Sequence, residues 1–269
     1  MTREEKLLYK IDKTLLGVEI GPSHNPIAPK KSGFNVHIID HMNKDELIKK
    51  YKDHNVDLSN IEEVDFVWKG ESYSELTRRS KSYSWILASH VIEHTPDIIS
   101  FLNECDAILK ENGVLSLAIP DVRYCFDYFR PITGVSKVID AYLHKNKIHT
   151  PGTAAEYFLN FAKRDGNISW FEGYRGELAL EFSIEDAYNQ MNAVIRDKIY
   201  LDLHSWCFTP TSFRLLIQDL NSLGLINLKE VSFFPSEGCE FFIKLSREGT
   251  GYLTNRIDAL KTIKAELSI

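Results

Sequence analysis

The amino-acid sequence predicts an α/β fold with a doubly wound, Rossmann-like sheet that is mostly parallel and ends in an antiparallel strand. Over residues 15–120, short apolar runs alternate with amphipathic helical stretches, which is typical of parallel strands connected by helices. Near the C-terminus, two apolar runs at 226–234 and 239–246 are separated only by the turn "PSEG". Because a parallel crossover needs a dozen or more residues, these two strands must be antiparallel.

Five strands are expected before residue 121, and each is apolar on both faces, as strands covered by helices on both sides are. Their ranges are 15–20, 35–40, 63–68, 84–89 and 113–120. Amphipathic helices are expected between them at 43–54 and 97–113, with Gly113 at the position of a C-terminal helix glycine. After the fifth strand, a further helix is expected from Thr209 or Thr211 to Gly224.

Residues 121–205 have a different character from the rest of the chain. They are rich in aromatic residues and helical patterns and contain no clear strand. We therefore expect a helical insert that caps a single domain of residues 1–269, because so few apolar strands do not build a second core.

A C-terminal helix is expected over residues 251–267. Its apolar residues recur at helical spacing, and we expect them to pack on the body of the domain, a docking surface for a partner being the alternative. They are Leu253, Ile257, Leu260, Ile263 and Leu267.

Composition excludes several classes of protein. The net charge of −6 argues against broad nucleic-acid binding, which requires a basic excess. The N-terminal segment is charged and lacks the apolar core of a signal peptide, and no apolar run is long enough to span a membrane. The four cysteines are scattered without metal or redox spacing. We therefore expect a cytoplasmic protein with reduced thiols.

The loop after the first strand carries the first functional signal. Glu19 ends that strand, Gly21 follows it, and Asp40 ends the second strand 21 residues after Glu19. Ligands of open parallel sheets bind beyond the carboxyl ends of the strands, and an acid near this spacing binds the ribose hydroxyls of a nucleotide. Gly21 allows the backbone to approach the ligand closely because it has no Cβ.

The rest of the dinucleotide-binding fingerprint is absent. Its later glycines normally seat a pyrophosphate on a helix N-terminus. Here three prolines occupy that loop and disfavour helix at the residues before them, namely Pro22, Pro26 and Pro29. The sequence therefore predicts a nucleoside ligand without phosphates, for which S-adenosylmethionine (SAM) is the candidate.

The segment "SWILASHVIEHTPDIISFLNECDAILKENGVLSLAIPD" (84–121) closely resembles the region around the fourth and fifth strands of class I SAM-dependent methyltransferases of the type 11 group. Those proteins share a strand followed by H-V-x-E-H, a helix, and a strand ending in proline and an acid. The resemblance covers most of 15–130 and 200–246 and implies a seven-stranded class I methyltransferase fold with SAM as cofactor. Of the family's E/D-x-G-x-G-x-G motif, only Gly21 is kept.

The pattern "EIGPSHNPIAPK" (19–30) looks like a bacterial subgroup often found beside or fused to glycosyltransferases. That resemblance implies methylation of a sugar or cell-surface glycan hydroxyl in polysaccharide biosynthesis, with a glycosyltransferase as partner or with homo-oligomers. Two alternatives remain open: a degenerate methyltransferase-fold scaffold, and an NAD-dependent sugar oxidoreductase, which the missing glycines disfavour.

By resemblance, the cofactor lies along the carboxyl ends of the first four strands. Glu19 and Gly21 would flank its methionine part within a loop that also contains Pro22 and Ser23. Asp40 would accept the ribose hydroxyls and Asp65 would lie near the adenine. Ser89 and His90, after the fourth strand, would lie next to the methyl group.

The segment His90–His94 also matches the zinc-binding pattern H-x-x-E-H. That pattern requires a long helix, whereas Pro96 makes this segment a strand-to-helix turn. We therefore expect no metal and expect Glu93 and His94 to shape the turn through hydrogen bonds. The less favoured alternative is a divalent cation, which a similar acid-rich turn binds in some quinone-pathway methyltransferases.

Transfer of a methyl group to a hydroxyl requires removal of a proton, a task suited to histidine. The candidate bases are His204, His90 and His149, each of which has a purely structural role as its alternative. Residues expected to bind the acceptor follow the fifth strand or precede the helix at 209–224. They are Asp121, Arg123, Tyr124, Arg130 and Trp206, which would equally suit ordinary core packing.

Overall fold

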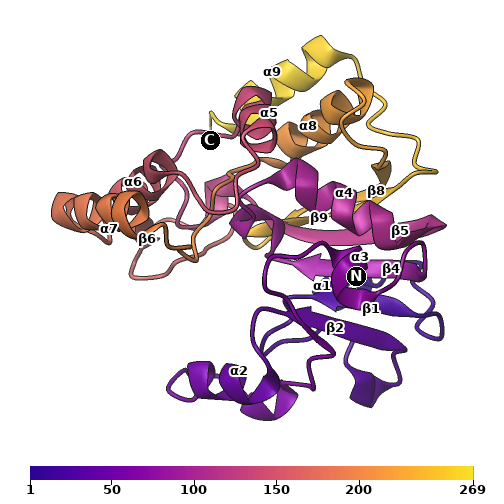
Figure 1. Ribbon diagram of the computed structural model, residues 1–269. Coiled ribbons are helices and arrows are strands. Elements are labelled where there is room, and N and C mark those ends of the chain that lie inside the picture. Colours follow the sequence, from indigo (N-terminus) through magenta and orange to yellow (C-terminus); the bar gives the residue numbers. More distant parts are fainter. Residues whose placement is uncertain (269) are drawn as a thin grey trace.

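The computed structural model describes residues 1–268 and contains a seven-stranded sheet in the order β3-β2-β1-β4-β5-β9-β8 (Figure 1). The strands are β1 (Gly17–Ile20), β2 (Val36–Asp40), β3 (Phe66–Val67), β4 (Tyr83–Ser89), β5 (Leu109–Pro120), β8 (Lys229–Glu237) and β9 (Glu240–Ser246). The first five are parallel, whereas β9 is antiparallel to both β5 and β8. This mostly parallel Rossmann-like sheet, with an antiparallel strand inserted before the last edge, is the class I methyltransferase fold predicted from the sequence.

The helices cover the two faces of the sheet unequally. They are α1 (Arg3–Leu7), α2 (Lys44–Tyr51), α3 (Tyr73–Thr77), α4 (Ile98–Ile108), α5 (Val135–Leu143), α6 (Pro151–Asn160), α7 (Ile184–Asp197), α8 (Pro210–Ser222) and α9 (Arg256–Glu266). The main core lies between the sheet and α4, α5 and α8. A smaller core on the opposite face is closed by Leu7 of α1 and by Ile27 and Ala28 of the β1–β2 loop. On that face, a loop therefore covers the sheet where a helix usually does.

The predicted end of α4 at Gly113 is wrong. The helix ends at Ile108, and β5 already begins at Leu109, which pairs with Tyr83 before the register shifts in a bulge. Gly113 lies inside this bulge, where a Cβ would approach the Lys110 carbonyl oxygen to 2.9 Å. The glycine is required because the backbone folds back on itself there, and not because a helix ends.

The segment 121–205 is helical as expected, but it also contains a small antiparallel sheet. Strands β6 (Ala162–Arg164) and β7 (Leu178–Leu180) pair with each other and not with the main sheet. Three-residue strands are too short to show an alternating pattern, so the expectation of no strand was wrong. The elements α6, α7 and β6 form an arm that projects to one side of the molecule (Figure 1).

The predicted helix at the C-terminus forms as α9, but most of its apolar residues do not pack. Ala259 and Ile263 are buried against Leu215 of α8. Four of the five residues expected to pack are exposed: Leu253, Ile257, Leu260 and Leu267. Ala259 and Ile263 make the contact with α8, and the other large apolar residues face outward. Within residues 1–268, no helix has the length and apolar character needed to cross a membrane.

Candidate functional site

The carboxyl ends of β1 and β2 lie side by side and bring Gly21 next to Asp40. Gly21 has a left-handed φ of +63°, and a Cβ there would lie 3.1 Å from Val91 after β4. Asp40 is buried, and its carboxylate accepts hydrogen bonds from the backbone N–H groups of Ser23 (3.0 Å) and His41 (2.7 Å). Glycine and acid thus occupy one edge, as the spacing of the sequence predicted.

Glu19 holds the β1–β2 loop in place from inside the protein. Its buried carboxylate accepts hydrogen bonds from the N–H groups of Ile27 (2.6 Å) and Ala28 (3.0 Å). Burial raises the pKa of Glu19 to about 7, even though both hydrogen bonds favour the charged form. Between β1 and β2 the chain forms this loop and the short 3₁₀ helix η1 (Lys30–Ser32). With no α-helix N-terminus in residues 21–35, the loop lacks the usual seat for a pyrophosphate.

Asp65 lies before β3 and not at this edge, a position that does not favour the expected contact with adenine. It precedes β3, and its carboxylate accepts hydrogen bonds from the N–H of Ile38 (2.7 Å) and from Lys30 Nζ (2.6 Å). The residues after β3 lie beside Asp40 instead, because Trp68 donates its N–H to the Asp40 carbonyl oxygen (2.8 Å). The strand is two residues long, so its direction and end were not visible as a pattern.

Ser89 and His90 do lie at the carboxyl end of β4, but both already have partners. Ser89 Oγ accepts a hydrogen bond from Arg3 (2.6 Å), and His90 Nε2 lies 2.8 Å from Glu240. His90 has a left-handed φ of +53°, a costly conformation for a residue other than glycine. Burial lowers the pKa of His90, but the hydrogen bond to Glu240 and the negative charges of Glu93 and Glu240 outweigh it and raise the pKa overall. Sequence reasoning missed Arg3 and Glu240 because they come from the two ends of the chain.

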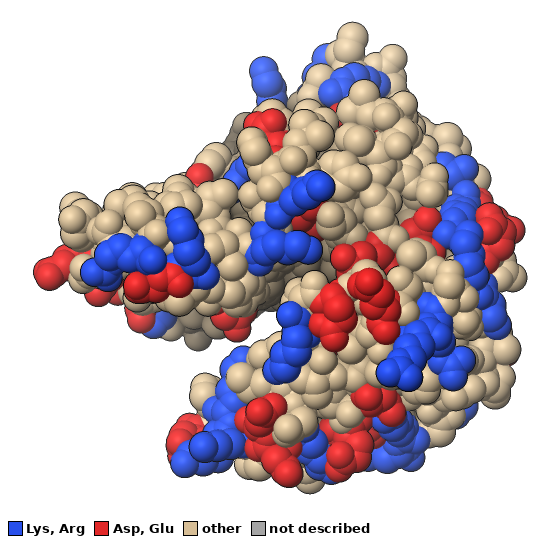
Figure 2. Space-filling view, in the orientation of Figure 1, with Lys and Arg blue, Asp and Glu red and all other residues tan. Residues whose placement is uncertain are grey.

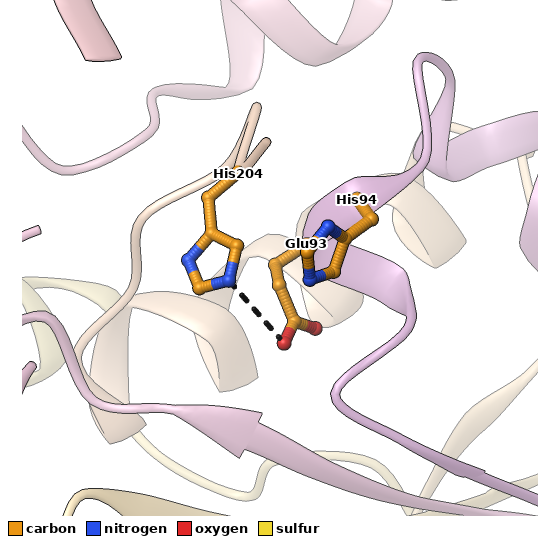
Figure 3. A group of neighbouring side chains, drawn as sticks. All are labelled: Glu93, His94 and His204. Carbon is orange, nitrogen blue, oxygen red and sulfur yellow. Dashed lines mark ion pairs between the residues drawn. The ribbon is translucent and has the colours of Figure 1, made fainter. Parts of the chain in front are cut away.

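Glu93, His94 and His204 converge on one point (Figure 3). The first two belong to the 3₁₀ helix η3 (Ile92–His94), and His204 precedes α8. One ligand atom from each lies within 4.8 Å of the others, and His204 Nε2 is 3.9 Å from Glu93 Oε1. The Glu93 side chain is fully buried, and neither of its carboxylate oxygens has a hydrogen-bond partner among the described residues. The turn forms as predicted, but Glu93 does not shape it through hydrogen bonds.

His204 is oriented by a buried ion-pair network. Its Nδ1 lies 2.5 Å from Asp127, whose other oxygen accepts a hydrogen bond from Arg130 (2.7 Å). Arg130 also donates to the His204 carbonyl oxygen (2.8 Å) and pairs with Glu156 of α6 (3.0 Å). Burial raises the pKa of Asp127, but the charges and hydrogen bonds of His204 and Arg130 outweigh it and lower the pKa overall. Arg130 is thus engaged in this network rather than free to bind an acceptor.

The other residues expected to bind the acceptor are divided between the core and a cavity. Trp206 is buried and donates its Nε1–H to the Thr95 carbonyl oxygen (2.6 Å), and Asp121 is fully buried against Arg123 (2.6 Å). For these two residues, packing inside the domain replaces the predicted contact with an acceptor. Arg123, Tyr124 and Arg130 line a cavity of about 220 Å³ together with Trp170, Tyr174 and Arg175. Neither Asp40 nor His90 lines this cavity.

His149 is the least suited of the three histidines to accept a proton. It is buried, and its Nδ1 is hydrogen-bonded to Ser205 Oγ. Burial, followed by the positive charge of His94, lowers its pKa to about 4. The neutral ring faces protein atoms, which suits a structural role.

A hollow lies on the side of the molecule where these strands end. Asp202, between α7 and α8, pairs with His94 (2.9 Å) and approaches Lys50 of α2 (3.9 Å). The segment before α8 therefore lies over the carboxyl ends of β2 and β4. Figure 2 shows the hollow between the part that carries α6 and α7 and the part that carries α2.

Comparison with known proteins adds the following. No protein-family model matches the sequence, and no curated protein matches it. Among solved structures, the model resembles the PH0226 protein of Pyrococcus horikoshii OT3 (13% identity, 91% of this chain and 87% of that one, TM-score 0.47). It also resembles a SAM-dependent methyltransferase from Aquifex aeolicus (11% identity, 90% of this chain and 88% of that one, TM-score 0.43). A third similar structure is a Rhodobacter sphaeroides protein described as a putative Zn-dependent alcohol dehydrogenase (12% identity, 91% of this chain and 89% of that one, TM-score 0.44).

These likenesses are distant, and their descriptions differ in activity. The class of this chain is therefore defined by its own strand order and by the position of Gly21 and Asp40 at one sheet edge. This strand order is that of a Rossmann-like domain with the class I methyltransferase fold.

Proposed function

We propose that this chain is a SAM-dependent methyltransferase. The observation that carries the proposal is the edge formed by Gly21 and Asp40 together with a first connection that offers no α-helix N-terminus to a phosphate. Such an edge suits a nucleoside whose ribose hydroxyls bind a carboxylate and which carries no pyrophosphate.

The reaction is an in-line displacement, in which positioning contributes much of the rate. A lone pair of the acceptor oxygen forms the new bond to the methyl carbon. The carbon–sulfur bond breaks, and its electron pair stays on sulfur to give neutral S-adenosylhomocysteine. The hydroxyl proton is lost to the cluster of His90, Glu93 and His204, in which His90 Nδ1 lies 3.4 Å and His204 Nε2 lies 3.9 Å from Glu93 Oε1.

We further propose that the acceptor is a hydroxyl of a sugar, within bacterial cell-surface polysaccharide synthesis. The support is a cavity that shares Arg130 with the His204 network and combines aromatic rings with arginines: Arg123, Tyr124, Trp170, Tyr174 and Arg175. Aromatic faces stack on sugar rings, and guanidinium groups donate hydrogen bonds to hydroxyls. A glycosyltransferase partner belongs to the same proposal.

Calorimetric titration with S-adenosylhomocysteine, in parallel with NAD, tests the cofactor. We expect the folded protein to bind the first and not the second. Binding of NAD alone would replace the proposal by a sugar oxidoreductase. Binding of neither would replace it by a methyltransferase-fold scaffold that has lost its cofactor.

The variant Asp40→Ala tests the site. Loss of hydrogen bonds to a charged group should cost roughly 1.5–3 kcal/mol, or a roughly 10- to 150-fold weaker affinity for S-adenosylhomocysteine. Asp65→Asn is the matched control, because Asp65 precedes β3 and lies away from the carboxyl ends of the strands. The affinity of this variant for S-adenosylhomocysteine should stay within about twofold of the parent. An unchanged affinity in folded Asp40→Ala would mean that the ribose is bound elsewhere.

A further inference from the structure

A buried carboxylate without a partner indicates that something is absent from the site. Glu93 is fully buried, and neither of its oxygens has a hydrogen-bond partner among residues 1–268. Burying such a group is costly unless it is hydrogen-bonded, paired with a charge or bound to a metal. Its nearest polar neighbours are imidazole rings: His90 Nδ1 lies 3.4 Å away and His204 Nε2 lies 3.9 Å away. These distances leave room for an additional group between the side chains.

The surroundings orient two histidines toward this point. Asp127 holds His204 through Nδ1, so that Nε2 faces Glu93 (Figure 3). Asp202 pairs with His94 Nδ1 at 2.9 Å. For His204, a carboxylate accepts from Nδ1 and leaves Nε2 directed into the site, which is the arrangement commonly seen behind metal-binding histidines.

We propose that Glu93, His94 and His204 bind one divalent transition-metal ion. The three ligand atoms lie within 4.8 Å of one another, so side-chain rotations are enough to bring them around one ion. Two imidazoles and one carboxylate suit zinc or cobalt better than magnesium or calcium, which prefer oxygen ligands. Three protein ligands leave open positions, and the side chain of His94, 30% exposed, gives a route for exchange with solvent.

This site differs from the zinc pattern that the sequence displays. The H-x-x-E-H spacing would use His90 and His94, whereas His90 turns toward Glu240 at 2.8 Å. Its place in the set is taken by His204, which lies 110 residues after His94 in the sequence. The sequence predicted no metal because Pro96 makes the H-x-x-E-H segment a turn, and this turn does form. The third proposed ligand, His204, belongs to a distant segment, so the pattern around Pro96 could not reveal it.

The role of the ion rests on the proposed function, although its binding does not. An acceptor hydroxyl placed at an open position would lose its proton more easily, because a bound divalent ion lowers the pKa of an oxygen ligand. The proton would leave toward the His90–Glu240 pair or to solvent, and the resulting alkoxide would attack the methyl carbon of SAM. His204 would then be a ligand and not the base.

The test is direct binding of metal to the tag-free protein after treatment with a chelator. We expect one equivalent of Co²⁺ to bind with the visible absorption of a nitrogen- and oxygen-ligated ion, and Zn²⁺ to displace it in calorimetry. Glu93→Gln and His94→Gln should each weaken Zn²⁺ binding at least about tenfold. His144→Gln, at an exposed histidine of the insert, should bind like the parent.

Two results would overturn the proposal. One is the absence of Co²⁺, Zn²⁺ and Mn²⁺ binding to protein that remains folded by circular dichroism. The other is equal metal affinity in the parent and in Glu93→Gln, which would place the ion elsewhere. Titration of the same samples with S-adenosylhomocysteine separates the two proposals, because metal binding without nucleoside binding would remove the methyltransferase and leave the metal site.

Discussion

Two carboxylates near the carboxyl ends of β1 and β2 differ in the groups from which they accept hydrogen bonds. Glu19 uses both oxygens to bind backbone N–H groups of Ile27 and Ala28, so it determines the path of the loop. Asp40 also receives backbone donors and pairs with His41 Nδ1 (2.6 Å), and it lies at the end of β2, the edge at which we propose that the nucleoside binds. Glu19 and Asp40 thus lie in neighbouring strands but have different hydrogen-bond partners.

The pH dependence of stability tests the environment of Glu19. Its pKa is raised from 4.5 to about 7 in the folded protein, so the unfolded chain releases this proton first as pH rises. The contribution of Glu19 to the free energy of unfolding therefore falls between about pH 4.5 and 7, by on the order of 3 kcal/mol at most, and is constant above that range.

Glu19→Gln removes this slope, because the amide does not titrate. It also loses one acceptor for the backbone, which lowers stability by about 1–3 kcal/mol at every pH. Urea unfolding of both proteins from about pH 5 to about pH 8 measures the difference. Parallel stability curves over this range would show that Glu19 ionises normally in the folded protein.

At the scale of elements, a capping box defines the start of α8, a few residues after His204. Thr209 is the N-cap, and its side chain accepts a hydrogen bond from the N–H of Ser212 in a reciprocal capping box. Five residues upstream, His204 lies outside any helix or strand, and the next residue, Ser205, donates its backbone N–H to the Glu93 carbonyl oxygen (2.7 Å). Of the two N-cap candidates in the sequence, the structure selects Thr209, because Thr211 is already inside the helix and its hydroxyl donates to Glu266 of α9.

Thr209→Val should lower the free energy of unfolding by about 1–2 kcal/mol, because the isosteric side chain leaves the cap unsatisfied in a buried place. Thr262→Val on the exposed face of α9 is the control and should change stability by less than about 0.5 kcal/mol. Denaturant melts of the three proteins measure both values. An effect of Thr209→Val no larger than that of the control would show that packing alone positions α8.

At the scale of the whole molecule, one buried network joins the insert to the site. Arg130 connects Asp127, Glu156 of α6 and the carbonyl oxygen of His204, which lie in segments up to 77 residues apart. The arm that carries α6 and α7 is therefore joined to the cluster of Glu93, His94 and His204 by the guanidinium of Arg130, in addition to the pair between Asp202 and His94. A change in this ion pair should affect both stability and the site.

Arg130→Met should cost about 3–5 kcal/mol in unfolding free energy, because it removes the positive partner of a buried carboxylate. Asp127→Asn combined with Arg130→Met should recover part of this loss, since neither charge then remains unpaired. Urea unfolding of the single and double variants gives the coupling energy between the two side chains. Strict additivity of the two substitutions would show that the pair does not act as a unit.

The sequence by itself determined most of the main sheet and one part of the site. Alternating apolar strands and helices predicted a parallel sheet, and a four-residue link between the last two strands required them to be antiparallel. Gly21 and Asp40 were placed together because the carboxyl ends of neighbouring parallel strands meet at one edge. These inferences use local pattern and the geometry of regular elements, which a single segment is enough to reveal.

Only the tertiary structure decided what Glu93, His90 and His204 contact. His90 meets Glu240 across 150 residues, Ser89 meets Arg3 across 86, and His204 meets Asp127 across 77. The bulge at Gly113 and the outward face of α9 were decided in the same way, by the fit of one segment against another. Periodicity reports the faces of an element but not its partners, because partners are selected by packing and charge among segments that have no relation in the sequence.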